Sequence, residues 1–210
     1  MKSMLFKLLH RPVYRRRIQV LSSTILQHLE PGDRVLDVGC GFGALGRALL
    51  DHPRAPSGLA VAGLERVKRG DEMIEVQSYD GVTMPAEDNG FDVVVLADVI
   101  HHEADSDRLL SEAARVAKRL LIIKDHKPDG WMSQERISLM DWAANTAYGV
   151  PCLYRYNTRD GWHALFDRFG LSLIAEADRM GLYPWPYSWV FTPRLQYFAA
   201  LSPRSYAEGG

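Results

Sequence analysis

The stretch from Arg34 to Gly46, RVLDVGCGFGALG, holds the residues best suited to binding a ligand. Apolar residues around Asp37 predict a short buried strand, and the leucines and alanines that follow at helical spacing predict a helix. Between them, Gly39, Gly41 and Gly43 allow positive φ and a close approach of the backbone to a ligand. The first N–H groups of the helix favour a polar or anionic group. We therefore expect a cofactor loop at the carboxyl edge of a sheet.

Two interpretations of this loop compete. Gly41 to Gly46 satisfies the dinucleotide pattern G-x-G-x-x-G, and Glu65 follows about twenty residues later. The same stretch reads DVGCGFG from Asp37, and this resembles motif I of class I S-adenosylmethionine-dependent methyltransferases. We favour the second interpretation, because Gly39 has already ended the strand and because a carboxylate suits an ammonium and a sulfonium better than a pyrophosphate. A nicotinamide-dependent oxidoreductase is the first alternative.

The resemblance implies which residues hold S-adenosylmethionine. Glu65, at the end of the second strand, stands where the family has an acid that accepts hydrogen bonds from both ribose hydroxyls. Asp80 stands where the family has an acid that accepts from the adenine amino group, and a turn capped by its own side chain is the alternative. The expected cofactor-binding residues are Asp37, Gly39, Cys40, Gly41, Gly43, Glu65, Asp80, Gly81 and Ala97.

Histidines follow the fourth and fifth predicted strands. The apolar run 91–99, FDVVVLADV, is typical of a central parallel strand and leads into His101 and His102. This pattern also looks like the fourth strand of methyltransferases that act on small molecules and lipids. The next strand, 120–123, leads into Asp125 and His126. Because the carboxyl ends of parallel strands meet at one edge of the sheet, we expect these side chains around one mouth.

Methyl transfer requires an aligned acceptor and, for an oxygen or an acidic carbon, removal of its proton. Histidine suits that proton transfer because its ordinary pKa lies near neutrality. We expect His102 or His126 to be the base, and one ring of the His101–His102 pair to pack under the following helix instead. A histidine that only bonds to the backbone is the alternative. A metal site from His102, Asp125 and His126 is conceivable, but no recognisable ligand spacing indicates one, and we expect none.

The acceptor side is expected to come from residues beyond the fifth strand. The predicted helix 132–148 carries Asp141, Trp142 and Asn145 on one turn, as a polar patch for the pocket or as a helix–helix hydrogen-bond network. The loop 181–193 is dense in Tyr, Trp and Pro and is interpreted either as an aromatic lid or as a dimer contact. The expected substrate residues are Asp125, Asn145, Tyr154, Tyr156, Tyr183 and Trp185. Such a site suits a small, largely apolar, natural-product or lipid-like metabolite.

The elements that position these residues predict an α/β fold. We expect a Rossmann-like, doubly wound sheet of seven strands, whose last strand runs antiparallel between the fifth and sixth as in the resembled family. Besides those above, the predicted strands are 59–64, 74–79, 171–177 and 195–201. The eight residues 66–73 are too few for a parallel crossover with a full helix, so a turn is expected there. The adenine would then be more exposed on that flank, or covered by another segment such as the N-terminal helices.

The first 29 residues contain no Asp or Glu but several Lys and Arg. We expect Pro12 to divide them into two short helices, the second with Ile18, Leu21 and Ile25 facing inward. A helical cap is favoured over peripheral membrane contact. The expected organisation is one domain, with a cap (1–30), a cofactor-binding core (34–126), a substrate side (127–202) and a flexible tail (203–210).

Composition sets further limits. The chain of 210 residues is 47% hydrophobic and carries a net charge of −1, which gives no general attraction to nucleic acid. Cys40 and Cys152 do not make a disulfide framework, and no apolar run approaches the roughly twenty residues of a membrane span. We expect a cytoplasmic protein that acts on a small-molecule acceptor, either as a monomer or as a homodimer. A non-catalytic S-adenosylmethionine-binding partner subunit is the second alternative.

Overall fold

The computed structural model describes residues 2–145 and 152–203, with the backbone alone for 2–12 and 144–145. Within these residues, seven strands form one sheet in the order β3-β2-β1-β4-β5-β7-β6, and β7 runs antiparallel to β5 and β6. The expected fold class and the place of the last strand are therefore confirmed. The strands are β1 (Arg34–Val38), β2 (Ala60–Glu65), β3 (Glu75–Ser78), β4 (Phe91–Ala97), β5 (Ala117–His126), β6 (Leu171–Ala177) and β7 (Gln196–Pro203).

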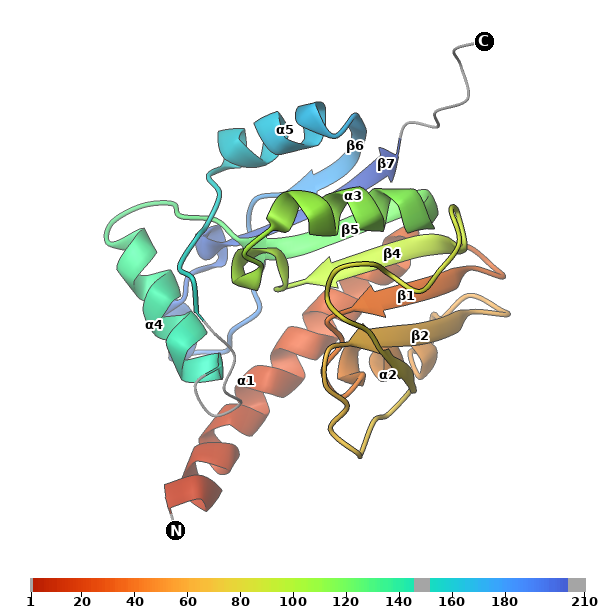
Figure 1. Ribbon diagram of the computed structural model, residues 1–210. Helices are drawn as coiled ribbons and strands as arrows, with labels where there is room; N and C mark the ends of the chain where they lie inside the picture. The colour runs from red at the N-terminus through yellow and green to blue at the C-terminus, as the bar shows by residue number, and fades with distance from the viewer. Residues whose placement is uncertain (1, 146–151, 204–210) are drawn as a thin grey trace.

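Helices cover both faces of the sheet and one of its edges (Figure 1). On one face, buried side chains of α1 and α2 pack on the alternate residues of β4 and β5 that include Val95 and Ile122. On the other face, α3 and α5 pack on the residues between them, such as Leu96 and Ile123. Helix α4 lies beyond the ends toward which β1 and β4 run. The helices are α1 (Lys2–Ile25), α2 (Ala44–Leu50), α3 (Ser106–Val116), α4 (Ser133–Asn145), α5 (Arg159–Arg168) and α6 (Tyr187–Val190), with short 3-10 turns η1 (Leu26–His28), η2 (Ile100–His102) and η4 (Pro193–Leu195).

Strand β5 is longer than the apolar pattern indicated. It runs through Lys124 and Asp125 to His126, because β7 pairs with it as far as the register His126↔Gln196. The charged residues at its end are therefore part of the strand, and they alternate between its two faces. Lys124 and His126 follow the side of Ile122, and Asp125 follows the side of Ile123.

The expected break of the N-terminal helix at Pro12 is wrong. The backbone of α1 is one helix from Lys2 to Ile25. A proline removes only its own main-chain donor, and a long helix that is anchored further along can continue through it. That anchor is the predicted inner face, with Leu21 and Ile25 fully buried. Across the described residues, every helix falls short of the apolar length needed to cross a bilayer.

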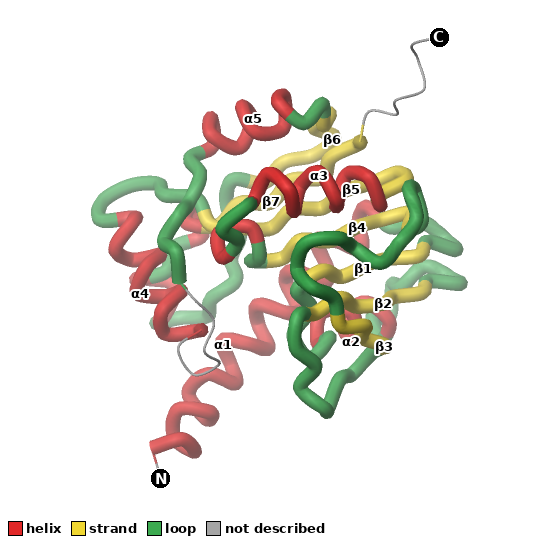
Figure 2. The backbone as a smooth tube through the Cα atoms, viewed as in Figure 1, coloured by secondary structure: helices red, strands yellow, loops and turns green. Residues whose placement is uncertain are grey.

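The connection between β2 and β3 contains no helix within the described residues, as the sequence predicted (Figure 2). The chain instead turns through residues 66–74 and is held to the glycine loop, since Met73 N donates to Phe42 O at 2.8 Å. Arg69 covers the ring of Phe42, with 4.7 Å from its guanidinium carbon to the ring centroid. This flank of the cofactor loop is therefore covered by a turn rather than by a helix.

Candidate active site

The glycine loop after β1 is fixed to the end of β2. Gly39 N donates to Leu64 O at 2.8 Å, and Gly41 N donates to Oε2 of Glu65 at 2.8 Å. Gly39, Gly41 and Gly43 have φ values of 70°, 58° and 75°, in the region that favours glycine. The loop and the acid expected to bind the ribose thus form one rigid unit before any ligand is considered.

Gly39→Ala should destabilise the protein more than an ordinary glycine replacement at positive φ. A Cβ at Gly39 would lie 2.7 Å from Cγ2 of Val99, whereas a Cβ at Gly32, whose φ is 83°, meets nothing within 4 Å. Gly32→Ala therefore reports the backbone strain alone, about 1–2 kcal/mol, and the clash should add roughly 1–3 kcal/mol in Gly39→Ala. Urea unfolding of both variants checks this, and equal losses would show that no close packing exists at Val99.

Asp37 is a buried carboxylate whose charge is incompletely compensated. Its side chain is 3% exposed, and Oδ2 has no hydrogen-bond partner among the described residues. Burial raises its pKa to about 7, against the opposing effect of Arg17, and Glu65 adds to the rise. A carboxylate in this position favours a cationic ligand. It therefore fits the ammonium and sulfonium of S-adenosylmethionine.

Glu65 and Asp80 differ in how they are held. Oε1 of Glu65 also accepts from Arg66 N at 2.9 Å, and the side chain is half-buried at the carboxyl edge. Asp80 is exposed and caps its own turn, since Oδ1 accepts from the main-chain N–H groups of Val82 and Thr83 at 2.7 and 2.9 Å. The turn that sequence reasoning gave as the alternative is thus present. Contact of Asp80 with an adenine stays a prediction.

The remaining expected cofactor residues line the same edge. Cys40 N donates to Leu64 O at 3.2 Å, and burial raises the pKa of the Cys40 thiol to about 12, so it stays protonated. Ala97 ends β4 opposite Lys124 of β5. Gly81 has a φ of 78°, and a Cβ there would fall on the guanidinium of Arg66. The glycine at position 81 thus lets the Arg66 side chain pack against the backbone at this part of the edge.

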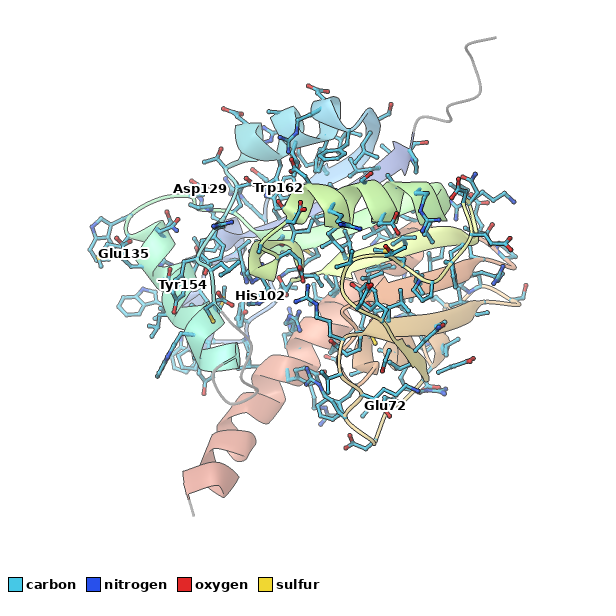
Figure 3. The ribbon with its side chains drawn as sticks, viewed as in Figure 1. Glu72, His102, Asp129, Glu135, Tyr154 and Trp162 are labelled. Atoms are coloured by element: carbon cyan, nitrogen blue, oxygen red, sulfur yellow. The ribbon has the colours of Figure 1, made fainter. Side chains whose placement is uncertain are left out.

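The histidines expected around one mouth do come together. His101 and His102 are in η2, and His126 ends β5; the ring of His101 lies 4.0 Å from that of His102 and 4.9 Å from that of His126, between centroids. Nδ1 of His101 lies 2.5 Å from Oδ1 of Asp125. Nε2 of His101 and Nε2 of His102 each lie 3.4 Å from Oδ1 of Asp141 on α4. Figure 3 shows His102 at the edge of the sheet that faces α4.

Burial and neighbouring charges separate the protonation of these groups. Burial lowers the pKa of His101, but Asp125 and Asp141 outweigh it and raise that pKa to about 10. Burial raises the pKa of Asp141, but His101 and His102 outweigh this effect and lower that pKa to about 2. Burial lowers the pKa of His126 to about 3, with Lys124 and His101 adding to the effect. In the ligand-free protein, His101 is therefore cationic and His126 neutral at pH 7.

A second group of charged residues was not predicted from the sequence. Asp98, just after β4, has a φ of 58° and forms ion pairs with Arg17 of α1 and Lys124 of β5. Burial raises the pKa of Asp98, but the charges of Lys124 and Arg17 outweigh this effect and hold that pKa well below its ordinary value. Nε2 of His126 lies 3.6 Å from Oδ1 of Asp98. The acid directly after the apolar run was the available signal, but nothing in the pattern indicated its partner in α1.

Only some of the expected substrate residues belong to the histidine cluster. Tyr156 belongs to the cluster, because its hydroxyl donates to Oδ2 of Asp141 at 3.0 Å, and Asp125 holds His101. Tyr183 is half-buried and faces Arg17 and Asp98, and burial raises its pKa. Tyr154 and Trp185 are 41% and 85% exposed. The side chain of Asn145 lies outside the described residues.

The expected polar patch on α4 is only partly present. Asp141 is 2% exposed and turned toward the histidines, whereas Trp142 is 53% exposed. Successive residues of a helix are about 100° apart, so these two neighbours face different surroundings. Ile137 and Met140 of the same helix are buried.

The strand order, the antiparallel β7 and the glycine loop after β1 define the fold of a class I S-adenosylmethionine-dependent methyltransferase. A solved S-adenosylmethionine-dependent methyltransferase from Aquifex aeolicus has this fold, with a TM-score of 0.61 and 18% identity over 95% of this chain and 97% of that chain. The sequence model of a family described as a methyltransferase domain matches residues 10–176, and the chain belongs to this family.

Two curated relatives share between a third and half of their length with this chain. A demethylmenaquinone methyltransferase from Symbiobacterium thermophilum is 33% identical over 117 residues, which cover 48% of this chain and 46% of the relative. The 24-methylenesterol C-methyltransferase 2 of Arabidopsis thaliana is 30% identical over 125 residues, which cover 55% of this chain and 34% of the relative. The chain thus spans less than half the length of either relative.

Proposed function

We propose that this protein transfers the methyl group of S-adenosylmethionine to an oxygen or carbon of a small, largely apolar metabolite. The observation that carries this proposal is the juxtaposition at one sheet edge of the buried carboxylate of Asp37 on β1, the glycine loop that follows it, and a cluster of histidines. The cofactor supplies an activated methyl group. The chain then has to hold the cofactor, align the acceptor and manage its proton.

The cofactor would be held by carboxylates and by the glycine loop. Asp37 would neutralise the cofactor's cationic end, and both oxygens of Glu65 would accept from the ribose hydroxyls while keeping their bonds to Gly41 and Arg66. Asp80 and Gly81 would meet the adenine at the flank where β2 and β3 are joined by a turn. This set needs no residue outside the described edge.

The acceptor would enter between η2, the end of β5 and α4. His101 and His102 line this space together with Tyr156, and His126 offers Nδ1, which is buried and has no hydrogen-bond partner among the described residues. We assign the acceptor's proton to His126 on this geometry. Burial and the neighbouring cations lower the pKa of His126 to about 3, so the acceptor, as it loses its proton, would have to raise this pKa toward neutrality for the ring to act as a base. Two curated relatives are named for demethylmenaquinone and a 24-methylenesterol, which favours an apolar acceptor, whereas a third is named for sarcosine and dimethylglycine, which are small polar amines.

Calorimetry with S-adenosylmethionine and, separately, with NADH tests the cofactor. We expect S-adenosylmethionine to bind with one site per chain and NADH to give no heat of binding. Purified protein that carries S-adenosylhomocysteine and methylates a member of an acceptor panel would support catalysis. Tight NADH binding with no S-adenosylmethionine binding would overturn the proposal.

His126→Asn should lower turnover by about 100-fold or more, because general-base catalysis contributes on that order, and should leave the dissociation constant of S-adenosylmethionine unchanged. His163→Asn is the matched control, since His163 on α5 pairs with Glu176 away from the cluster. Turnover with the best acceptor and calorimetry on the same samples give both readouts. A wild-type rate in His126→Asn would remove the base role from this residue and leave His102 as the candidate.

A further inference from the structure

Two imidazole nitrogens lie at the same separation from one oxygen of Asp141. Nε2 of His101 and Nε2 of His102 both lie 3.4 Å from the same oxygen, Oδ1 of Asp141, whereas N–H···O bonds span about 2.7–3.2 Å. The His101 side chain is 2% exposed, and its Nε2 has no hydrogen-bond partner within the described part of the chain. A buried imidazole nitrogen is therefore aimed at a carboxylate oxygen that it does not reach.

The geometry points to a divalent transition-metal site, of the zinc type, formed by Nε2 of His101, Nε2 of His102 and Oδ1 of Asp141. A tetrahedral ion with bonds of about 2.0–2.1 Å holds its ligand atoms about 3.4 Å apart, which is the separation of both nitrogens from Oδ1. All three ligand atoms lie within 4.8 Å of one another. Three protein ligands leave a fourth position for an exogenous group, as in catalytic rather than structural sites.

The surroundings of the three ligands match those of a metal centre. A ligating histidine usually donates its other ring N–H to a carboxylate, and Nδ1 of His101 does so to Asp125 at 2.5 Å. A ligating carboxylate is usually hydrogen-bonded, and Asp141 accepts from the hydroxyl of Tyr156 at 3.0 Å. His102 is the more exposed of the two ligating rings, with its side chain 12% exposed, so the open position would face the acceptor's entry.

A neighbouring group of possible ligands is less suitable. Asp98, His101 and His126 also lie close enough to hold an ion. However, Oδ1 of Asp98 already pairs with Lys124, and Oδ2 pairs with Arg17, so this carboxylate is neutralised by two cations. Asp125 and Asp141 instead face imidazole rings. Their charge can be balanced by a proton on His101 or by a bound cation, and these are the two states that the experiment separates.

Metal binding is measured without cofactor or acceptor, so its result does not depend on the proposed methyl transfer. Tag-free protein, treated with chelator and dialysed, is titrated calorimetrically with Zn²⁺, and with Co²⁺ while visible d–d absorption is recorded. We expect one ion per chain and the intense spectrum of tetrahedral Co²⁺. His102→Ala and Asp141→Asn should each weaken Zn²⁺ binding by more than about 100-fold, since even outer-shell changes cost 10–100-fold.

Two further variants make the result specific. Asp125→Asn should weaken Zn²⁺ binding by about 10–100-fold without changing the stoichiometry, because Asp125 orients His101 and is not itself a ligand. His163→Ala removes a half-buried histidine outside the cluster and should leave binding unchanged. Thermal unfolding of each variant confirms that it is folded. Absence of Zn²⁺ and Co²⁺ binding by the wild type, or wild-type affinity for Zn²⁺ in both His102→Ala and Asp141→Asn, would overturn the metal site.

Discussion

Glu65→Ala is expected to weaken S-adenosylmethionine binding by about 100-fold or more. If both oxygens of Glu65 accept from the ribose, the change removes two charge-assisted hydrogen bonds of roughly 1.5–3 kcal/mol each, and about 1.4 kcal/mol corresponds to a factor of ten. The same change also releases Gly41 N, which donates to Oε2 at 2.8 Å, and so loosens the glycine loop. Calorimetric titration with S-adenosylmethionine measures the loss.

Two further variants separate ribose recognition from loop support. Glu65→Gln keeps one acceptor oxygen and should fall between the wild type and Glu65→Ala. Glu75→Ala, on the exposed edge strand β3, removes a carboxylate that lies on the neighbouring strand, and affinity should stay at the wild-type value. If Glu65→Ala binds S-adenosylmethionine as tightly as Glu75→Ala does, Glu65 does not bind the ribose.

The sheet was predictable because each of its central strands carries a local signal. The apolar runs of β1 and β4 and the glycines after β1 are sequence-local, and so is the short interval that leaves no room for a helix between β2 and β3. The ends of elements were less predictable where a partner decides them. Strand β5 extends to His126 because β7 pairs with it, and α1 continues through Pro12 because its later turns are anchored on the sheet.

The candidate site was predictable only as far as strand ends determine it. His101, His102 and His126 were expected at one edge, and they meet there. The partners that set their charge come from distant segments, Asp141 from α4 and Arg17, through Asp98, from α1. Such pairs depend on how helices dock on the sheet, and helical spacing alone could not tell whether Asp141 or Trp142 faces inward. The sequence could therefore place the histidines but not their protonation.

Asp37→Asn should make the ligand-free protein less sensitive to rising pH. Burial raises the pKa of Asp37 from its ordinary 3.8 to about 7, so between these values the folded state holds a proton that the unfolded state has lost. The wild type therefore loses stability as pH rises from 4 to 7, while the variant has no such group. The difference in unfolding free energy between variant and wild type should shift in the variant's favour by roughly 2–4 kcal/mol between pH 4 and pH 8.

The groups that face Asp37 are Arg17 and Glu65, and they are present in both proteins, so the difference between them isolates the Asp37 carboxyl. Urea unfolding at several pH values gives this difference, and any constant cost of burying an amide cancels from its pH dependence. At pH 8, bound S-adenosylmethionine should stabilise the wild type more than Asp37→Asn, because the ammonium of the cofactor would compensate the Asp37 charge. Asp37→Asn should bind S-adenosylmethionine about 10–100-fold more weakly than the wild type does. A difference that stays constant from pH 4 to pH 8 would mean that Asp37 is ionised at no cost. This carboxylate would then not be held ready for a cationic cofactor.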